Sequence, residues 1–195
     1  MNHQWKRTDT HWISECAIFL TLEIVFLVVP FLQIELGAFT IVFSALPIAV
    51  ATIRLGLRAA IILGVAWGGI SFSQAFTDSF GLVMLNANFI GTFIVLGVSR
   101  LLVGVCTAFT YNFLSKFKRI RHISIAITCF MASVFNNLFF MGGMAVFFKD
   151  TFLEFIYPIL GSSILFNMLP ETIVCVILGT AIVTAFQKSG IPQSK

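Results

Sequence analysis

The chain carries, in the stretch Phe135-Asn136-Asn137-Leu138-Phe139-Phe140-Met141-Gly142-Gly143, two adjacent amides within an apolar segment. That segment, residues 123–148, is long enough to cross a membrane. In hydrocarbon, an amide without a hydrogen-bond partner costs about 2–7 kcal/mol. Asn136 and Asn137 are therefore expected to face protein, water or a ligand rather than lipid. Because neighbours on a helix point about 100° apart, one amide can line a cavity while the other holds two helices together.

The composition of the whole chain indicates a membrane protein. Its 195 residues are 58% hydrophobic and 10% charged, with a mean hydropathy of +1.01, unlike a soluble domain of this size. We therefore expect an all-α membrane protein with a single domain over residues 1–195. The net charge of +4 does not indicate nucleic-acid binding, because the basic residues lie in short loops between apolar segments.

The chain contains six apolar segments separated by short polar links. They predict a six-transmembrane-helix bundle with helices at about residues 13–29, 39–55, 59–76, 86–114, 123–148 and 161–186. Of the 12 Lys and Arg residues, all but Arg100 and Lys149 lie at the two termini, the 2–3 turn or the 4–5 loop. If six helices cross the membrane, these four regions lie on the same side of it. Because Lys and Arg are enriched in cytoplasmic loops, that side is predicted to be the cytoplasm. Both termini are therefore predicted to be cytoplasmic, and the first segment, which lacks a cleavage pattern, is expected to remain as a span.

Polar side chains are predicted to gather at one depth of this bundle. With a rise of 1.5 Å per residue, four helices bring amides, a hydroxyl, an indole or a carboxylate to the outer half of the membrane. These residues are Trp67, Ser71, Gln74, Asn86, Asn88, Asn136, Asn137, Asn167 and Glu171. The shared depth predicts an outward-facing pocket for a small polar molecule. The alternative for each amide is a bond between helices, worth about 0.6–2 kcal/mol.

Two residues of the helices, Trp67 and Arg100, each have two possible roles. Trp67 is either a packing residue or a wall against which a ligand lies. Arg100, also a candidate ligand-binding residue, either pairs with Glu23 or binds an anionic ligand group. The Glu23 pair is favoured, because intramembrane charges usually pair with one another. A stripe of small residues predicts the close approach of another helix, at Gly56, Ala60, Gly64 and Gly68.

Catalytic and metal-binding patterns are absent from the sequence. It contains no nucleophile–base pair, no His-Cys-carboxylate cluster and no P-loop motif. The cysteines, Cys16, Cys106, Cys129 and Cys175, fall in apolar segments without a C-x-x-C pair, and we expect small buried thiols. We therefore expect no enzymatic activity, no cofactor and no metal in this chain.

Several motifs together resemble the S components, the substrate-binding subunits, of energy-coupling factor (ECF) vitamin transporters. They are Ala17-x-x-x-Thr21, Leu46-Pro47-Ile48-Ala49 before Leu55-Gly56-Leu57-Arg58, Ser99-Arg100-Leu101-Leu102-Val103-Gly104, and Asn136-Asn137 before Gly142-Gly143. The last motif is most similar to the pantothenate-type branch. The resemblance covers nearly the whole chain, with departures at Thr21, where Ala is usual, and at Leu57 and Ser99, where Pro is found.

The resemblance implies a high-affinity vitamin-binding subunit of an ECF-type ABC transporter in the bacterial cell membrane, with pantothenate as the favoured vitamin. It implies a coupling subunit, EcfT, that docks on Ala17 and Thr21, and two ABC ATPases that hydrolyse ATP. Asn136 would contact the ligand, and the bundle would topple to release it inward. The alternatives are a receptor for hydroxymethylpyrimidine or pyridoxine, with Trp67 stacked on a flat ring, and a structural membrane subunit that binds no ligand.

Overall fold

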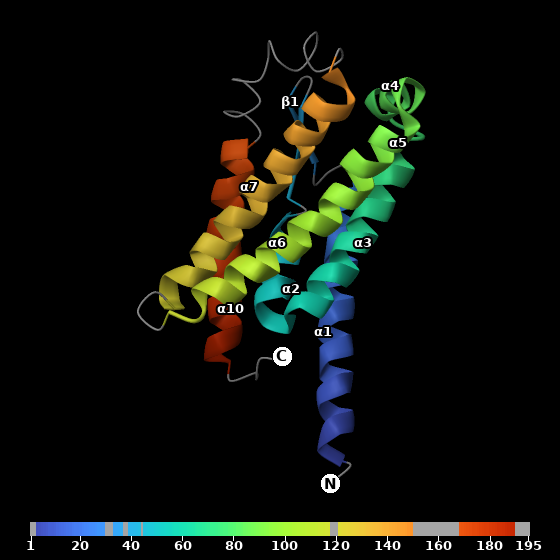
Figure 1. Ribbon diagram of the computed structural model, residues 1–195. Helices are drawn as coiled ribbons and strands as arrows, with labels where there is room; N and C mark the ends of the chain where they lie inside the picture. The colour runs from blue at the N-terminus through green and yellow to red at the C-terminus, as the bar shows by residue number, and fades with distance from the viewer. Residues whose placement is uncertain are drawn as a thin grey trace.

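The computed structural model describes residues 3–29, 33–36, 39–43, 45–117, 121–149 and 168–189, with side chains at 10–29, 43, 45–117, 123–149 and 168–189. This part of the chain is helical apart from one two-stranded ribbon (Figure 1). Its elements are α1 (His3–Val28), β1 (Gln33–Leu36), β2 (Phe39–Val42), α2 (Ala45–Leu55), α3 (Leu57–Gln74), α4 (Ser79–Ala87), α5 (Phe89–Thr92), the π-helix η2 (Phe93–Val98), α6 (Ser99–Leu114), α7 (Arg121–Phe147) and α10 (Leu169–Lys188).

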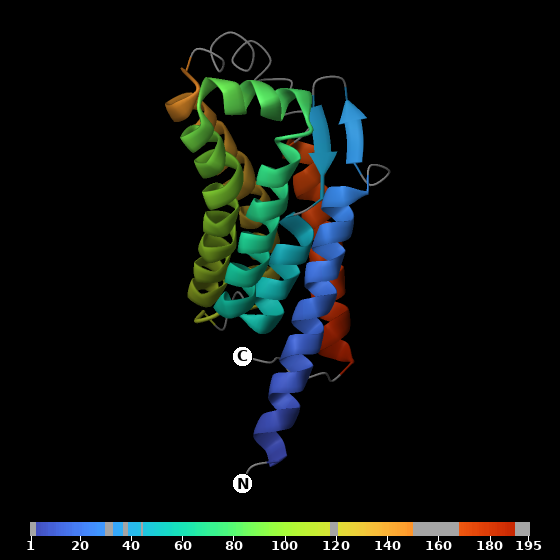
Figure 2. The same cartoon turned by 90° about the vertical axis from the view of Figure 1, so that its right-hand side faces the viewer.

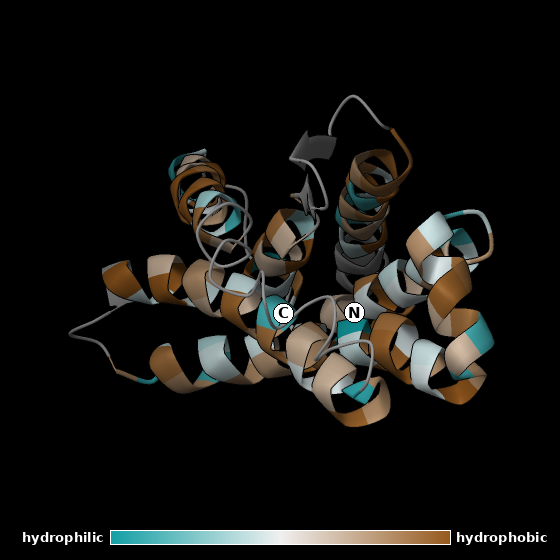
Figure 3. Ribbon diagram, turned by 90° about the horizontal axis from the view of Figure 1, so that it is seen from above, coloured by the Kyte–Doolittle hydropathy of each residue, from teal (hydrophilic) through white to brown (hydrophobic). Residues whose placement is uncertain are grey.

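Five helical segments of the described chain are long and apolar enough to cross a membrane. They are Thr10–Val28, Leu57–Gln74, Phe89–Leu114, Ile123–Phe147 and Leu169–Lys188. Coloured by hydropathy, the ribbons are mainly brown or pale, with few teal stretches (Figure 3). These helices confirm that the chain is a helical membrane protein, with five of the six predicted spans long and apolar enough to cross a membrane. The predicted start of the last helix, residue 161, lies outside the described residues.

The second predicted span, residues 39–55, is wrong as a spanning helix. Residues 39–42 form strand β2, which pairs antiparallel with β1 so that Leu36 lies opposite Phe39. Helix α2 has 11 residues, about 16 Å at 1.5 Å per residue, whereas the hydrocarbon core is about 30 Å thick. The β-branched residues Thr40, Ile41 and Val42 favour a strand. The helix is therefore limited to the C-terminal part of the segment, Ala45–Leu55.

Helix α2 is the centre of the bundle. All 11 of its residues are buried, and it packs against α1, α3, α6, α7 and α10. A helix with apolar residues on every side is stable when every side is buried. The five surrounding helices bury α2 in this way. Pro47 is tolerated because it stands in the first turn. The turn into α3 uses Gly56, whose φ of 82° is a conformation that favours glycine.

The small-residue stripe of α3 lies close to another helical segment, as predicted, and that segment is η2 and the start of α6. A Cβ atom on Gly68 would collide with the Gly97 carbonyl oxygen in η2, and one on Gly64 would lie 2.9 Å from Leu101 Cα in α6. Larger side chains would therefore push α3 and α6 apart. The prediction for the cysteines is also confirmed in part, since all four thiols are free and three are buried.

The predicted fourth helix, residues 86–114, is interrupted near its N-terminal end, at Asn88. Helix α4 begins after Asp78, whose carboxylate accepts from the Gly81 N–H at 3.1 Å, and lies across the end of the bundle (Figure 2). Asn88 has an extended backbone and accepts from the Gly91 N–H at 2.9 Å, which starts α5. The predicted 78–81 link is therefore mostly helical, because Asp78 and Asn88 are both N-caps.

The beginning of α1 and the end of α10 lie at the same end of the bundle, together with the α2–α3 turn (Figure 2). Basic residues of that end are Arg54, Arg58, Lys116 and Lys188. The arrangement agrees with the predicted clustering of positive charge. That this end faces the cytoplasm remains a prediction from the orientation rule.

Candidate functional site

The two adjacent asparagines of α7 meet an arginine from α6 and a glutamate from α10. Arg100 donates from Nη1 to the Asn136 amide oxygen. Asn136 donates from Nδ2 to Glu171 Oε1 at 3.2 Å, and Asn137 donates to Glu171 Oε2 at 3.3 Å. Asn136 therefore stands between a cation and a carboxylate and bonds to both. We call Arg100, Asn136, Asn137 and Glu171 the polar cluster.

Glu171 is held by its position in the first turn of α10, directly after Pro170. A carboxylate is favourable there because the first N–H groups of a helix carry partial positive charge. One turn below the asparagines, Ser133 and Thr172 join α7 to α10 through their hydroxyls, 2.8 Å apart. Asn137 also donates to the Ser133 carbonyl oxygen at 2.9 Å. These bonds fix the facing sides of the two helices at the level of the cluster.

Aromatic rings enclose Arg100. Its Cζ atom lies 4.7 Å from the centre of the Trp67 ring and 5.7 Å from that of Phe140, within range of cation–π attraction. The buried Nε–H makes no hydrogen bond to a described residue. An arginine has five N–H donors, so this guanidinium retains donor capacity for a further acceptor.

The π-helix η2 sets the direction of Arg100. A π-helix has more residues in each turn than an α-helix, so the residues after it are rotated about the axis relative to a regular helix. η2 ends at Val98, two residues before Arg100. Ser99 donates its hydroxyl to the Val95 carbonyl oxygen, within this widened turn. The irregular turn thus directs Arg100 toward α7.

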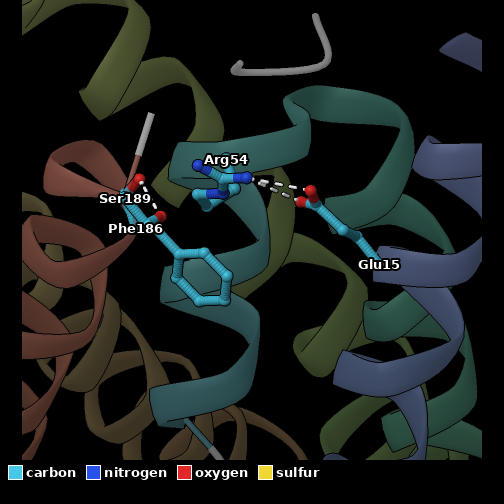
Figure 4. A network of polar contacts seen from close by, with 4 residues as sticks. All are labelled: Glu15, Arg54, Phe186 and Ser189. Atoms are coloured by element: carbon cyan, nitrogen blue, oxygen red, sulfur yellow. Dashed lines mark hydrogen bonds and ion pairs between the residues drawn. The ribbon is translucent and has the colours of Figure 1, made fainter. Parts of the chain in front are cut away.

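The favoured pairing of Arg100 with Glu23 is wrong. The Glu23 oxygens make no hydrogen bond in the described part of the chain, and Arg100 bonds to Asn136 instead. The reason is helix order, since α6 packs against α3 and α7 while α1 packs against α2 and α3. A direct ion pair is found elsewhere, where Arg54 Nη2 lies 2.9 Å from Glu15 Oε1 (Figure 4).

Several candidate site residues lie apart from the polar cluster. Gln74 donates to the Leu27 carbonyl oxygen at 2.7 Å and ties α3 to α1. Asn88 caps α5, and Asn86 is exposed on α4. Ser71 is half-buried on α3, one turn after Trp67, and the prediction for Asn167 falls outside the described residues. Gln74, Asn86 and Asn88 therefore do not bond to the polar cluster, and fewer of the predicted residues meet at one place than the sequence indicated.

Of the predicted residues, Trp67, Arg100, Asn136 and Asn137 are brought together. Two further residues lie at this place: Glu171, a member of the cluster that the sequence placed in the outer layer but not among the ligand-binding residues, and Phe140, which the sequence did not single out. Glu171 was placed at the right depth, and an acid in an apolar segment is itself a signal of function. Phe140 follows Asn136 by four residues and so shares its helix face.

The polar cluster offers complementary groups to a small molecule. Arg100 can donate to an anionic group, and Glu171 can accept from hydroxyl or amide groups. The rings of Trp67 and Phe140 supply an apolar wall. Within the described ranges, no three His, Cys, Asp or Glu side chains lie together as metal ligands. The arrangement therefore suits an organic anion that also carries hydrogen-bond donors.

A comparison with known proteins gives the chain a relative along nearly its whole length. A pantothenic acid transporter, PanT, from Lactococcus lactis subsp. cremoris (strain MG1363) is 26% identical over 196 residues. The aligned region covers 94% of this chain and 97% of the relative. No family model matches the chain. This chain is thus a helical membrane protein similar from end to end to a transporter of pantothenic acid.

Proposed function

We propose that the chain is the high-affinity substrate-binding subunit of an ECF-type vitamin transporter and that its substrate is pantothenate. The observation that carries the proposal is the polar cluster, in which Asn136 separates the Arg100 guanidinium from the Glu171 carboxylate. The similarity to a pantothenic acid transporter supports the choice of vitamin.

Pantothenate carries one carboxylate, one amide and two hydroxyls. Its carboxylate would accept from Arg100, whose Nε–H is buried without a partner in the described chain. Its hydroxyls would donate to Glu171, and its amide would exchange hydrogen bonds with Asn136 or Asn137. The gem-dimethyl carbon of the ligand would pack against Trp67 or Phe140. Each polar group of the vitamin thus has a partner of the matching kind.

The docking face proposed for the coupling subunit lies on α1. Ala17 and Thr21 are both exposed, and the Thr21 hydroxyl is turned back to the Ala17 carbonyl oxygen at 2.8 Å. With its hydroxyl bonded to its own helix, Thr21 presents a small, largely apolar surface. Small residues allow another helix to approach closely, and this supports docking despite the Thr at this position.

A flat vitamin such as pyridoxine or hydroxymethylpyrimidine fits the site less well. Its ring would stack on Trp67, but the Arg100 guanidinium already lies over that ring. Stacking would displace Arg100 from a cation–π contact worth about 2 kcal/mol when desolvated. The geometry therefore favours an acyclic anion.

The test is the binding of tritiated pantothenate to the purified chain in lipid nanodiscs. We expect saturable binding that unlabelled pantothenate abolishes and pyridoxine does not. Asn136→Ala should weaken binding, whereas Asn112→Ala, at an exposed amide of the same bundle, should not. Binding of another vitamin in place of pantothenate would change the substrate, and the absence of binding by any vitamin would favour a structural subunit.

The assembly is tested separately by co-purification. A tagged chain expressed in its own host should bring down a transmembrane coupling subunit and two ATPases. Ala17→Trp together with Thr21→Trp should abolish this recovery while leaving pantothenate binding intact. Pantothenate binding without any co-purified ATPase would contradict the ECF assignment and retain the receptor role.

A further inference from the structure

Glu23 is an acidic residue that has no role in the proposed binding of the vitamin or in the docking of the coupling subunit. It lies within the α1 span, five residues before its last residue, Val28, and has 0% exposed surface. On the same face of α1, Cys16, Phe19 and Leu27 are buried in the apolar core. Neither carboxylate oxygen has a hydrogen-bond partner in the described chain. An ionised carboxylate in such a place is among the most unfavourable arrangements in a protein.

The charged groups of the adjoining helices lie away from Glu23. On α2 the charged residue is Arg54, which bonds to Glu15, eight residues or about 12 Å along α1 from Glu23. On α3 it is Arg58, which is exposed at the start of the helix. No cation on either helix is thus in position to neutralise Glu23.

Helix α10 also reaches α1, where the Phe19 and Phe186 rings lie 6.5 Å apart. Its charged residues are Glu171, which belongs to the polar cluster, and Lys188, which is exposed in the last turn. Neither bonds to Glu23. The described side chains that surround Glu23 therefore provide neither a counter-ion nor a donor.

We propose that Glu23 is a proton-binding site sealed between α1 and the adjoining helices α2 and α3. A metal ion needs at least four ligands from side chains or bound waters, and a buried water needs two to four polar partners. Glu23 has no exposed surface, and its carboxylate has no hydrogen-bond partner among the described residues, so it offers neither. A proton requires only the carboxylate itself, and once bound it removes the buried charge.

The same geometry links proton exchange to the movement of α1. Of the five candidate spans, α1 has the smallest buried share, 22%, and it lies at the edge of the bundle (Figure 2). Gln74 fastens α1 to α3 through the Leu27 carbonyl oxygen, one turn from Glu23. Water reaches Glu23 only when α1 separates from α2 and α3, so the proton is retained while the helices are packed.

Infrared spectroscopy of the full chain in nanodiscs tests the bound proton. A protonated carboxylic acid has a carbonyl stretch apart from the amide and carboxylate bands. We expect this band at neutral pH, its loss in Glu23→Gln and its persistence in Glu171→Gln. If Glu23→Gln does not fold, Glu23→Asp should shift the band. A wild-type spectrum without the band, or a band that neither Glu23 variant alters, would overturn the proposal.

Hydrogen exchange tests the seal. On transfer to D2O the band should shift slowly, because exchange waits for α1 to open. Gln74→Ala should speed the shift about tenfold, the change expected from losing one hydrogen bond that holds the interface. Ser73→Ala is the matched control, since Ser73 is exposed and bonds within α3. Immediate exchange in the wild type, or equal effects of the two variants, would contradict the seal. These readouts need no vitamin, so they are independent of the proposed function.

Discussion

Arg54 and Arg100 are two arginines inside one apolar bundle, and they differ in how each is joined to an acidic side chain. Each lies over an aromatic ring, Arg54 at 4.5 Å from Phe186 and Arg100 at 4.7 Å from Trp67. Arg54 binds its acid directly, with one nitrogen 2.9 and 3.1 Å from the two oxygens of Glu15 (Figure 4). Arg100 is separated from its acid by the amide of Asn136.

The difference separates a structural charge from one available to a ligand. A direct pair neutralises both charges and leaves little for a third group to gain. An amide between the charges holds the helices in register but leaves each charge incompletely paired. An anion can then approach Arg100, and a donor can approach Glu171, without first breaking an ion pair. Arg54 and Arg100 both connect helices, but only Arg100 is left with the capacity to bind an anionic ligand.

The largest expected effect is on ligand affinity when Arg100 is changed. Arg100→Gln should weaken pantothenate binding at least about 100-fold, since truncating one partner of a buried charge pair costs about 2–5 kcal/mol. Equilibrium binding of tritiated pantothenate measures the change. Arg100→Lys, which retains the charge but not the planar fork, should recover only part of the affinity. Unchanged binding in Arg100→Gln would remove Arg100 from the site.

The next effect is on stability when Arg54 is changed. Arg54→Gln should lower the free energy of unfolding by about 3 kcal/mol, the lower part of the range for breaking a buried pair, because Glu15 retains 16% side-chain exposure. Urea unfolding in a fixed lipid–detergent mixture measures it. The folded fraction should bind pantothenate as the wild type does.

The control for this variant is Arg58→Gln. Arg58 is exposed and lies four residues after Arg54, so its loss should change stability by no more than about 0.5 kcal/mol. Equal destabilisation by the two variants would mean that removal of positive charge from this end, rather than the Glu15 pair, accounts for the effect.

The smallest effects distinguish the two asparagines. Asn136→Ala should lower pantothenate affinity about tenfold, whereas Asn137→Ala should lower it about threefold or less, within the range measured for single hydrogen bonds between membrane helices. Asn136 bonds to both charged residues, while Asn137 shares its donor group between Glu171 and its own helix. Isothermal titration measures both. A larger loss for Asn137→Ala would reverse the roles assigned here.

Sequence patterns predicted the main features of the fold where the signal was local. Long apolar segments marked five helices that can span, and the Gly64–Gly68 spacing marked the close contact of α3 with α6. The second span was wrong because apolarity alone does not distinguish a strand leading into a short helix from one long helix. The fourth helix was predicted correctly from residue 89 to 114, but its start was placed three residues early and α4 was missed, because the capping roles of Asp78 and Asn88 were not recognised.

By itself the sequence determined that this is a helical membrane protein and that Asn136 and Asn137 need polar partners, because hydropathy and the cost of burying an amide belong to individual segments. Only the tertiary structure decided which partners those are. Arg100 and Glu171 are 71 residues apart in the chain, and the sequence favoured Glu23 as the partner of Arg100, whereas helix packing places α6 beside α7. Contact between distant side chains depends on helix order and rotation, which no local pattern encodes.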